Sequence, residues 1–365
     1  MHVVYDHQIF SSQEYGGISR YIVEVARQLE RCDDTRVTIL APVHMNGFLR
    51  AQPPSHVVGT YVRPIRRTAR MRAVLNDALS RGWLAVRPLS LIHETYYRER
   101  SLAPLRYPTV VSVYDMIHER FAHTFPATDQ TARLKAAAVR RADAVICISE
   151  QTRRDLLELL PVAPDKVSVV HLASTLVTPP ADDRAPEIRD PYLLYVGHRR
   201  AYKNFAALLR AIAGSDSLRR GFRLVCFGGG PFTSEELMTA EGLGLDSTSL
   251  LYREGGDERL ANLYRNAAAF VYPSLYEGFG IPLVEAMAHG CPVACSATSS
   301  MPEVGGDAVE YFDPAQPEDI AAAIRRIVDS DARAGDLRRR GAARATLFSW
   351  QQCARDTHRV YARLL

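Results

Sequence analysis

The sequence has no long apolar run. A helix that crosses a bilayer needs about 18 or more consecutive apolar residues. Every apolar stretch of this 365-residue chain is interrupted by charge, proline or glycine before that length. The opening residues, MHVVYDH, place an acid directly after a short apolar run and lack the basic start of an export signal. We therefore expect no membrane span, no leader peptide and a cytoplasmic location.

Disulfide and metal-binding patterns are also missing. The six cysteines are scattered along the chain: Cys32, Cys147, Cys226, Cys291, Cys295 and Cys353. The close pair Cys291 and Cys295 lacks the C-x-x-C spacing of a redox site, and no further His or Cys pair stands nearby to complete a zinc site. We expect buried, reduced thiols, no bound metal and no cofactor.

Lysine is scarce. Only Lys135, Lys166 and Lys203 stand among 45 basic residues, and the net charge of +4 is too small to indicate nucleic-acid binding. Lys203 follows the apolar run 193–196 and precedes an amphipathic segment. A compact ammonium in an arginine-dominated chain suits a crowded phosphate oxygen, and the simpler interpretation is a surface charge after a strand.

Arginines crowd one stretch. Arg63, Arg66, Arg67, Arg70 and Arg72 precede apolar residues at helical spacing, namely Val74, Leu75, Leu79, Trp83 and Leu84. One interpretation is a solvated helix face. The other is a basic amphipathic helix that touches anionic lipid or an anionic acceptor, so that Arg63–Trp83 makes a peripheral contact with the inner membrane.

Short apolar runs alternate with helical patterns, which is typical of parallel sheets covered by helices. A first series of strands is expected at 37–40, 109–113, 144–148 and 167–170, and a second at 193–196, 223–227, 269–272 and 292–295. The polar, proline-rich stretch 178–186 separates the two series. The sequence therefore predicts an α/β protein with two doubly wound, Rossmann-like domains.

Paired glycines follow the opening strand. Gly16 and Gly17 precede an amphipathic helix expected at about 18–29. Glycines at a helix N-terminus allow backbone N–H groups to approach an anion such as phosphate. A plain tight turn is the alternative, because the pattern is not G-x-G-x-x-G.

The segment 272–290 carries the strongest signal. It predicts a strand end, a glycine-containing loop and a short helix with Pro282 at its first position and Gly290 at its C-terminal cap. The free N–H groups of such a helix can hold a diphosphate. Glu277 precedes the helix and Glu285 lies within it, and ionised carboxylates accept hydrogen bonds from vicinal hydroxyls. Two carboxylates beside a helix N-terminus match a nucleotide-sugar.

Glu277 and Glu285, with seven residues between them, resemble the EX7E motif of retaining glycosyltransferase family 4, which has the GT-B fold. The resemblance covers nearly the whole chain, and the stretches 16–21 and 114–119 look like those of transferases that build bacterial surface polysaccharides. It implies an N-terminal acceptor-side domain at 1–177, a linker at 178–190 and a C-terminal nucleotide-sugar domain at 191–349, with a cleft between the domains. It also implies a last helix at about 350–365 that crosses back to the first domain.

Roles carried over from the family place the donor between the loop and the helix. Glu277 meets the donor sugar and Glu285 the ribose, while Arg199 and Lys203 neutralise the diphosphate. The remaining donor-binding residues implied are Gly16, Gly17, Gly278, Phe279, Gly280, Ile281, Pro282 and Leu283.

Two positions depart from the family pattern. Many relatives have a His-Asp pair after the strand equivalent to 109–113, where this chain has Tyr114 and Asp115. His118 follows and is a candidate for the same role, although a lone His is more often structural. The donor-clamp Arg is also displaced, because His198 follows Gly197 and the guanidinium comes at Arg199.

The resemblance implies a metal-independent, retaining hexosyltransferase. On the same resemblance the leading donor is GDP-mannose, followed by other hexose or deoxyhexose donors, and the acceptor is a glycan or lipid-linked glycan of surface polysaccharide or O-antigen synthesis. The catalytic candidates are Glu277, Asp115, Tyr114 and His118. The alternatives are a nucleotide-sugar epimerase or a phosphorylase of the same fold, and a non-catalytic nucleotide-sugar-binding subunit. A nicotinamide dehydrogenase is disfavoured, because no G-x-G-x-x-G follows a strand.

Overall fold

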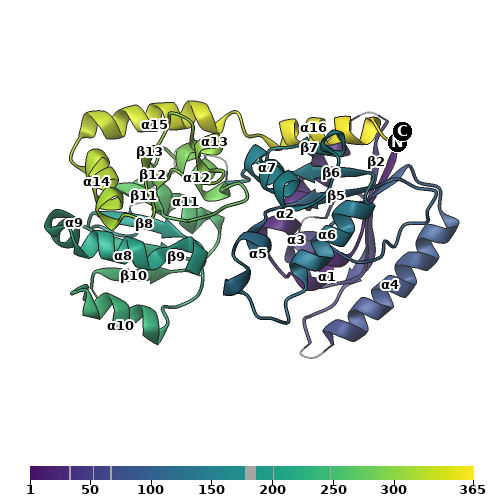
Figure 1. Ribbon diagram of the computed structural model, residues 1–365, viewed down its shortest axis with the longest axis horizontal. Helices are drawn as coiled ribbons and strands as arrows, with labels where there is room; N and C mark the ends of the chain where they lie inside the picture. The colour runs from purple at the N-terminus through teal and green to yellow at the C-terminus, as the bar shows by residue number, and fades with distance from the viewer. Residues whose placement is uncertain (33, 52, 66–67, 177–185, 200, 247) are drawn as a thin grey trace. The chain divides into compact units, whose positions relative to one another are not determined.

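The computed structural model describes residues 1–365 apart from 33, 52, 66–67, 177–185, 200 and 247 (Figure 1). Arg66, Arg67 and most of the expected linker therefore lie outside the described residues. The chain divides into two compact units, Met1–Leu172 with Ser349–Leu365, and Ala173–Phe348. The expected first boundary at 177 differs from this division, because Ala173 already clusters with the second unit.

The first unit is built on a parallel sheet. Its strands, among the described residues, are β1 (His2–Tyr5), β2 (Arg36–His44), β3 (Val57–Tyr61), β4 (Leu91–Glu94), β5 (Thr109–Val113), β6 (Ala144–Cys147) and β7 (Val167–Val169), in the order β3-β2-β1-β4-β5-β6-β7. Every residue of β4, β5 and β6 is buried, as expected for strands covered on both faces. The chain reverses its direction across the sheet between β1 and β4.

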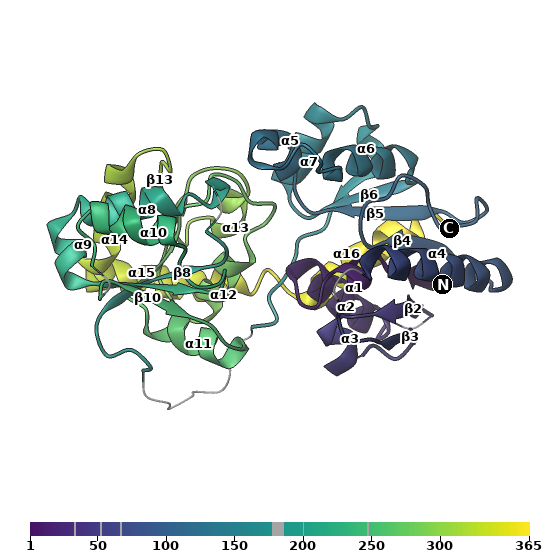
Figure 2. The ribbon, with the colours of Figure 1, turned by 90° about the horizontal axis from the view of Figure 1, so that it is seen from below.

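Most helices described in the first unit pack against this sheet. The described helices of this unit are α1 (Gln8–Ser12), α2 (Gly17–Leu29), α3 (Gly47–Ala51), α4 (Ala69–Val86), α5 (Ile117–Arg120), α6 (Thr131–Arg141), α7 (Glu150–Leu159) and α16 (Trp350–Ala362). The predicted helix at 18–29 is α2, which buries Tyr21, Ile22 and Val25 on its inner face. Figures 1 and 2 both show α4 along the outer edge of this unit.

The C-terminal helix α16 is anchored by buried polar groups, and Figure 2 shows it beside α2. The Tyr361 hydroxyl lies 2.8 Å from that of Tyr5 and 2.6 Å from Nδ1 of His93. His93 Nε2 reaches the Ser112 hydroxyl at 2.9 Å. Complete burial lowers the pKa of His93 to about 3, so the imidazole stays neutral.

The second unit repeats the strand order of the first. Its described strands are β8 (Tyr192–Val196), β9 (Arg223–Phe227), β10 (Leu250–Arg253), β11 (Ala269–Tyr272), β12 (Val293–Ser296) and β13 (Glu310–Phe312), all parallel, in the order β10-β9-β8-β11-β12-β13. The chain reverses its direction across this sheet between β8 and β11. The predicted α/β class with two doubly wound sheets is confirmed.

Eight α-helices are described in the second unit: α8 (Phe205–Ala213), α9 (Asp216–Gly221), α10 (Ser234–Gly242), α11 (Asp257–Asn266), α12 (Ile281–Ala288), α13 (Met301–Gly305), α14 (Pro317–Val328) and α15 (Asp331–Ala345). The core lies where α8 and α14 cover one face of the sheet with Leu208, Ile212 and Ile324. Within the described ranges, no helix is both long and apolar enough to span a bilayer.

Four strands were not predicted from the sequence: β3, β4, β10 and β13. In two of them a buried charged or polar residue breaks the apolar pattern. In β4, His93 and Glu94 are both buried, and Arg141 holds Glu94 with two hydrogen bonds of 2.8 Å. In β13, the buried Glu310 pairs with arginines of α14 and α15. These partners are distant in sequence, so no local pattern identifies them.

Candidate functional site

The site begins at the carboxyl ends of β8 and β11. In an open doubly wound sheet, ligands bind at the carboxyl ends of two neighbouring parallel strands whose following connections run to opposite sides of the sheet. The two loops diverge there and leave a crevice. The turn η3 (Ala201–Lys203) follows β8, and the loop with Glu277 follows β11. The backbone N–H of Leu275 donates to the Tyr202 carbonyl at 2.8 Å and ties the two loops together.

Lys203 and Glu277 meet at this point. Lys203 Nζ donates to Glu277 Oε1 at 2.6 Å, and both side chains are largely buried. The ammonium also lies over the rings of Tyr202 and Tyr272, at 5.5 and 5.6 Å from their centroids. An ammonium has three N–H donors. The pair therefore fixes a cation in a half-enclosed position, with donors left for an anionic ligand.

The Glu277 loop is held from the next strand. Ser299 and Ser300, which follow β12, donate to the Glu277 carbonyl at 2.7 and 2.9 Å, and Ser300 also donates to the Phe279 carbonyl at 3.0 Å. The N–H of Glu277 returns a bond to Ser299 Oγ at 3.1 Å. The sequence analysis did not identify these serines, and a Ser-Ser pair in a loop carries no distinctive signal.

Helix α12 starts immediately after this loop. Gly280 is its N-cap in a left-handed conformation, with no side-chain capping bond and no acid in the first turn. Pro282 has no N–H, and the N–H of Leu283 already donates to the Gly280 carbonyl at 3.0 Å. The N–H of Ile281, the first helical residue, has no intrahelical acceptor. Of the three residues 281–283 expected to donate N–H groups to a ligand, only Ile281 has an N–H that no acceptor of the helix itself uses.

The end of α12 agrees with the prediction. Gly290 has φ +67° and follows the C-cap His289. Its N–H bonds the Met287 carbonyl, and the N–H of Cys291 bonds the Ala286 carbonyl, which together form a Schellman motif. The expected C-terminal cap at Gly290 is confirmed.

Glu285 lies inside α12 and is buried. Its Oε2 accepts a 3.2 Å hydrogen bond from the hydroxyl of Tyr264 on α11. Burial and the neighbouring Glu285 carboxylate raise the pKa of Tyr264 well above its usual range, so the phenol remains a donor. In the same way, burial and Glu277 raise the pKa of Tyr272. Each carboxylate of the predicted pair therefore has a tyrosine beside it, which the sequence did not indicate.

Arg199 is placed differently from expectation. Its guanidinium donates to Glu236 at 2.8 Å and to the carbonyls of Gly228, Gly230 and Pro231 at 2.8 to 3.3 Å. Its side chain is only 3% exposed. A buried guanidinium must have its donors satisfied, and here four of its five N–H groups serve protein acceptors. In this structure Arg199 holds the loop 228–231 rather than facing a ligand.

That loop approaches the β8 turn closely. Gly229 has φ +74°, and a Cβ there would lie 2.5 Å from the Gly197 carbonyl oxygen. Only glycine fits this contact without backbone movement. The clamp by Arg199 therefore fixes the shape of the turn that leads to Lys203.

In the first unit, Asp115 follows β5. Its backbone carbonyl accepts from Lys135 Nζ at 2.7 Å, and its carboxylate accepts from the Ile117 N–H at 3.0 Å. Lys135 is completely buried and also donates to Glu119 at 2.8 Å. The Asp115 side chain is 28% exposed. Its catalytic role stays a prediction.

Tyr114 points into the core instead of the site. Its hydroxyl donates to the Thr95 carbonyl at 3.0 Å, and burial raises its pKa well above the usual range. A phenol that is buried and already donates to a carbonyl cannot exchange protons with a substrate. We therefore remove Tyr114 from the catalytic candidates.

His118 lies on α5. Its ring stacks on Phe125 with centroids 4.1 Å apart, and Nε2 is 3.9 Å from an Asp129 oxygen. Nδ1 is buried and has no hydrogen-bond partner among the described residues. His118 thus packs against Phe125, and its catalytic role stays a prediction.

Gly16 and Gly17 lie at the start of α2. Gly16 is the N-cap, without a side-chain capping bond, and its extended backbone is open to any residue. A Cβ on Gly17 would meet nothing within 4 Å. Neither glycine is required by its backbone conformation, and their predicted role in anion binding stays a prediction.

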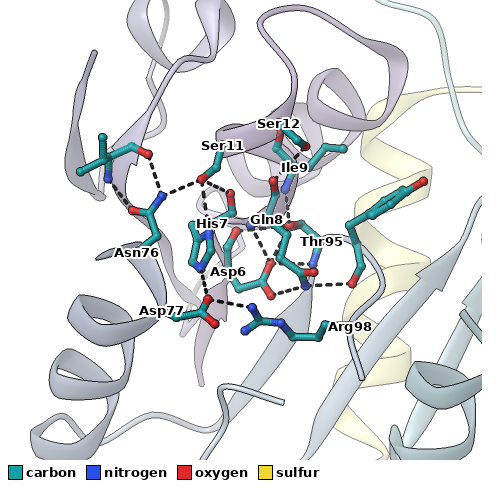
Figure 3. A network of polar contacts seen from close by, with 12 residues as sticks. Asp6, His7, Gln8, Ile9, Ser11, Ser12, Asn76, Asp77, Thr95 and Arg98 are labelled. Carbon is teal, nitrogen blue, oxygen red and sulfur yellow. Dashed lines mark hydrogen bonds and ion pairs between the residues drawn. The ribbon is translucent and has the colours of Figure 1, made fainter. Parts of the chain in front are cut away.

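A polar network closes the carboxyl ends of β1 and β4, the reversal point of the first sheet (Figure 3). The Asp6 carboxylate accepts from the N–H and hydroxyl of Thr95 at 3.0 and 2.6 Å and from the side-chain amide of Gln8 at 2.7 Å. His7 lies 3.0 Å from Asp77 of α4. The sequence analysis used the acid after the first strand, Asp6, only to argue against an export signal and predicted no site at these residues.

The described residues contain no cluster of three or more His, Cys, Asp or Glu side chains that could hold a metal ion. All six cysteines are free thiols, and all except Cys32 are buried. The expected burial is confirmed for five of the six thiols, and Cys32 is only partly buried.

Comparisons with known proteins identify both halves of the chain. Residues 15–176 match the family described as Glycosyltransferase Family 4, and residues 181–345 match Glycosyl transferases group 1. O-antigen chain mannosyltransferase B of Escherichia coli is 31% identical over 60% of this chain and 60% of its own length. O-antigen chain mannosyltransferase RfbU of Salmonella typhimurium is 26% identical over 85% of this chain and 87% of its own.

The alignment with O-antigen chain mannosyltransferase B spans less than two thirds of that protein's length. Among solved structures, sucrose-phosphate synthase of Thermosynechococcus elongatus superimposes with a TM-score of 0.76 over 100% of this chain and 98% of its own. The two share 20% sequence identity, so this likeness concerns the fold. The chain therefore belongs to the glycosyltransferases with the GT-B fold, in which a Glycosyltransferase Family 4 domain is followed by a Glycosyl transferases group 1 domain.

Proposed function

We propose that this protein transfers mannose from GDP-mannose, with retention of configuration, to a hydroxyl of a glycan or lipid-linked glycan in bacterial surface polysaccharide synthesis. The observation that carries the proposal is the Lys203–Glu277 pair at the reversal point of the second sheet, beside the start of α12. The choice of mannose rests on the two O-antigen mannosyltransferases named above. We place the reaction in the cytoplasm, where thiols stay reduced.

The donor lies on the second unit in this proposal. Lys203 and the N–H of Ile281 receive the diphosphate, Glu277 accepts hydrogen bonds from the sugar, and Glu285 from the ribose. Arg199 acts one step away, because it holds the 228–231 loop against the turn before Lys203. The acceptor lies on the first unit, with Asp115 as its candidate polar contact.

The reaction needs little acid-base chemistry from the protein. As the bond between the anomeric carbon and the diphosphate oxygen breaks, negative charge grows on the leaving group, and the fixed ammonium of Lys203 stabilises it. The acceptor oxygen then bonds to the anomeric carbon on the same face. Its proton passes to the leaving phosphate oxygen, so retention requires no nucleophile from the enzyme.

We also propose that the transfer needs no metal ion, because Lys203 supplies positive charge at the diphosphate. The one Asp-x-Asp sequence of the chain, Asp329-Ser330-Asp331, has a structural role instead. Ser330 is the N-cap of α15 and accepts from the Arg333 N–H at 3.2 Å.

A panel of nucleotide-sugars tests the proposal. A ligand that binds the native state raises its melting temperature, and GDP-mannose should give the largest increase. Wild-type protein should then add one hexose to a lipid-linked glycan acceptor, as mass spectrometry detects, and Lys203→Ala should reduce transfer about a hundredfold while it stays folded. Turnover of the donor without acceptor would favour an epimerase. Binding without transfer to any acceptor would favour a non-catalytic subunit.

A further inference from the structure

Helix α4 has its polar and apolar faces reversed. The residues that it buries against the unit include Asn76 and Ser80, whereas a helix on a soluble domain normally buries an apolar stripe. The Asn76 side chain bonds the N–H and the carbonyl of Val43, at 2.7 and 2.9 Å, and the Ser11 hydroxyl at 2.9 Å. Polar contacts thus hold much of α4 in place.

The apolar side chains of α4 point outward. Met71, Val74, Leu75, Leu79 and Val86 are between 46% and 78% exposed. Their spacing of three, four and seven residues places them on the side of the helix opposite Asn76 and Ser80. We call these five residues the α4 outer face. Leu84 and Trp83 belong to the inner side and pack on the core cluster of Val4, Leu40 and Ile92.

Positive charge surrounds the α4 outer face. Arg63, Arg70, Arg81 and Arg87 are exposed on the helix and its flanks. From 63 to 87 the sequence contains seven arginines and one acid, so the formal charge of +6 in this segment exceeds the +4 of the whole chain. The one acid, Asp77, faces inward to His7 and Arg98 at 3.0 and 2.8 Å.

These features indicate what covers the helix. An apolar face with arginines at its border matches the interface of a bilayer, where apolar side chains enter the acyl region and arginines meet anionic headgroups. A second copy of the chain is disfavoured, because a twofold contact through this face would bring the same arginines together without an exposed acid of α4 to pair with them.

Helix α4 also reaches the ligand end of its own sheet. Its inner residues Asn76 and Asp77 join the network around His7 and Ser11 at the carboxyl end of β1 (Figure 3). One helix therefore connects an outward apolar surface with the edge of the sheet at which Rossmann-like domains bind their ligands.

We propose that the α4 outer face docks on the surface of a bilayer that contains anionic phospholipid and so brings the first unit to a lipid-linked acceptor. Docking itself needs no turnover. The part of the inference that concerns the acceptor rests on the proposed function.

Vesicle co-sedimentation of the full chain tests the docking. Vesicles of phosphatidylcholine with about a third phosphatidylglycerol should bind the protein, phosphatidylcholine alone should bind it far less, and added salt should weaken the binding. The double variant Met71→Gln with Leu75→Gln should bind about tenfold less or weaker still, because apolar burial is lost. The matched control is Met238→Gln with Leu237→Gln on α10, whose side chains are 65% and 46% exposed, as against 69% and 46% for Met71 and Leu75.

The control variant should bind like the wild type. Arg70→Gln with Arg81→Gln should lower binding and make it less sensitive to salt. All variants should melt at the wild-type temperature, since the substituted side chains are exposed. No binding of the wild type to the anionic vesicles, or equal binding by the α4 double variant, would overturn the proposal. A wild-type dimer in analytical ultracentrifugation that the α4 double variant abolishes would assign the face to a second copy instead. These outcomes are independent of the proposed transfer, which a water-soluble acceptor measures separately.

Discussion

Two of the three lysines of this chain place a small cation beside a carboxylate. Lys203 meets Glu277 at 2.6 Å, and Lys135, completely buried, meets Glu119 and the Asp115 carbonyl. A planar guanidinium would need more donors satisfied in the same space. The scarcity of lysine in the sequence predicted a special position at 203. The same reasoning holds for Lys135, but its partners lie 16 and 20 residues away in the sequence and could not be identified from local spacing.

In the proposed function the two carboxylates have different roles, Glu277 at the donor sugar and Glu285 at the ribose. Glu277→Gln should lower kcat about a hundredfold, because a displacement of about 1 Å at a reacting sugar has that effect. Glu285→Gln should mainly raise the donor KM, because contact with the ribose changes little between ground and transition state. Steady-state kinetics with saturating acceptor and varied donor make the comparison. A Glu277→Gln enzyme with unchanged kcat would remove Glu277 from the reacting ring.

At the scale of elements, the strands and helices beside the site were the easiest to predict. The strands β5, β9 and β11 begin and end where the sequence predicted, because each is a short apolar run with turn residues or charges beside it. The start of α12 and its cap at Gly290 were also predicted, because proline and glycine act through the backbone itself. The contacts of Arg199 were not, since the loop 228–231 that it holds depends on the folding of the whole sheet.

The cap of α12 gives a test at this scale. Gly290 has φ +67°, and a Cβ there would touch no neighbour, so the cost of Gly290→Ala arises from the backbone alone. We expect a loss of about 1 kcal/mol in the free energy of unfolding and a melting temperature lowered by roughly 2 to 4 °C. The matched control is Gly242→Ala, because Gly242 ends α10 with equal space and no positive φ. Calorimetry that finds equal effects for both variants would contradict the Schellman assignment.

The anchor of α16 predicts a dependence of stability on pH. The pKa of His93 is lowered by burial from 6.5 to about 3. Below pH 6.5 the unfolded chain therefore takes up a proton that the folded chain does not bind. The contribution of neutral His93 to the free energy of unfolding is therefore complete above pH 6.5 and is lost as the pH falls toward 3. Between pH 7 and pH 5 we expect His93 to account for a loss of about 2 kcal/mol.

Urea unfolding measures this loss. Both tryptophans, Trp83 and Trp350, lie in the first unit, so their fluorescence reports the unit that contains His93. The His93→Gln variant should show a smaller difference in stability between pH 7 and pH 5 than the wild type, whatever its stability at pH 7. Equal differences in the two proteins would show that His93 does not titrate on unfolding.

At the scale of the whole molecule, two units with one strand order serve different roles in the proposed function. Each sheet reverses between its first and fourth strand, and each carries polar residues at that point: Lys203 and Glu277 in the second unit, and Asp6 and His7 in the first. The sequence predicted the doubly wound class, but only the folded sheets bring these residues together.

The proposed use of protein cations in place of a metal gives the prediction for the whole enzyme. Transfer should continue at the wild-type rate in excess EDTA, because Lys203 remains at the diphosphate. The control is a metal-dependent transferase assayed in the same buffer. Complete loss of transfer that magnesium or manganese restores would require a metal at the donor site.

In the proposed function the donor binds at the reversal point of the second sheet, and a crystal structure of the full chain with bound GDP would locate it. We expect the diphosphate within hydrogen-bond distance of Lys203 Nζ and the Ile281 N–H, with the ribose hydroxyls at the Glu285 carboxylate. A diphosphate bound instead at Gly16 and Gly17, without contact to Lys203, would contradict the proposal.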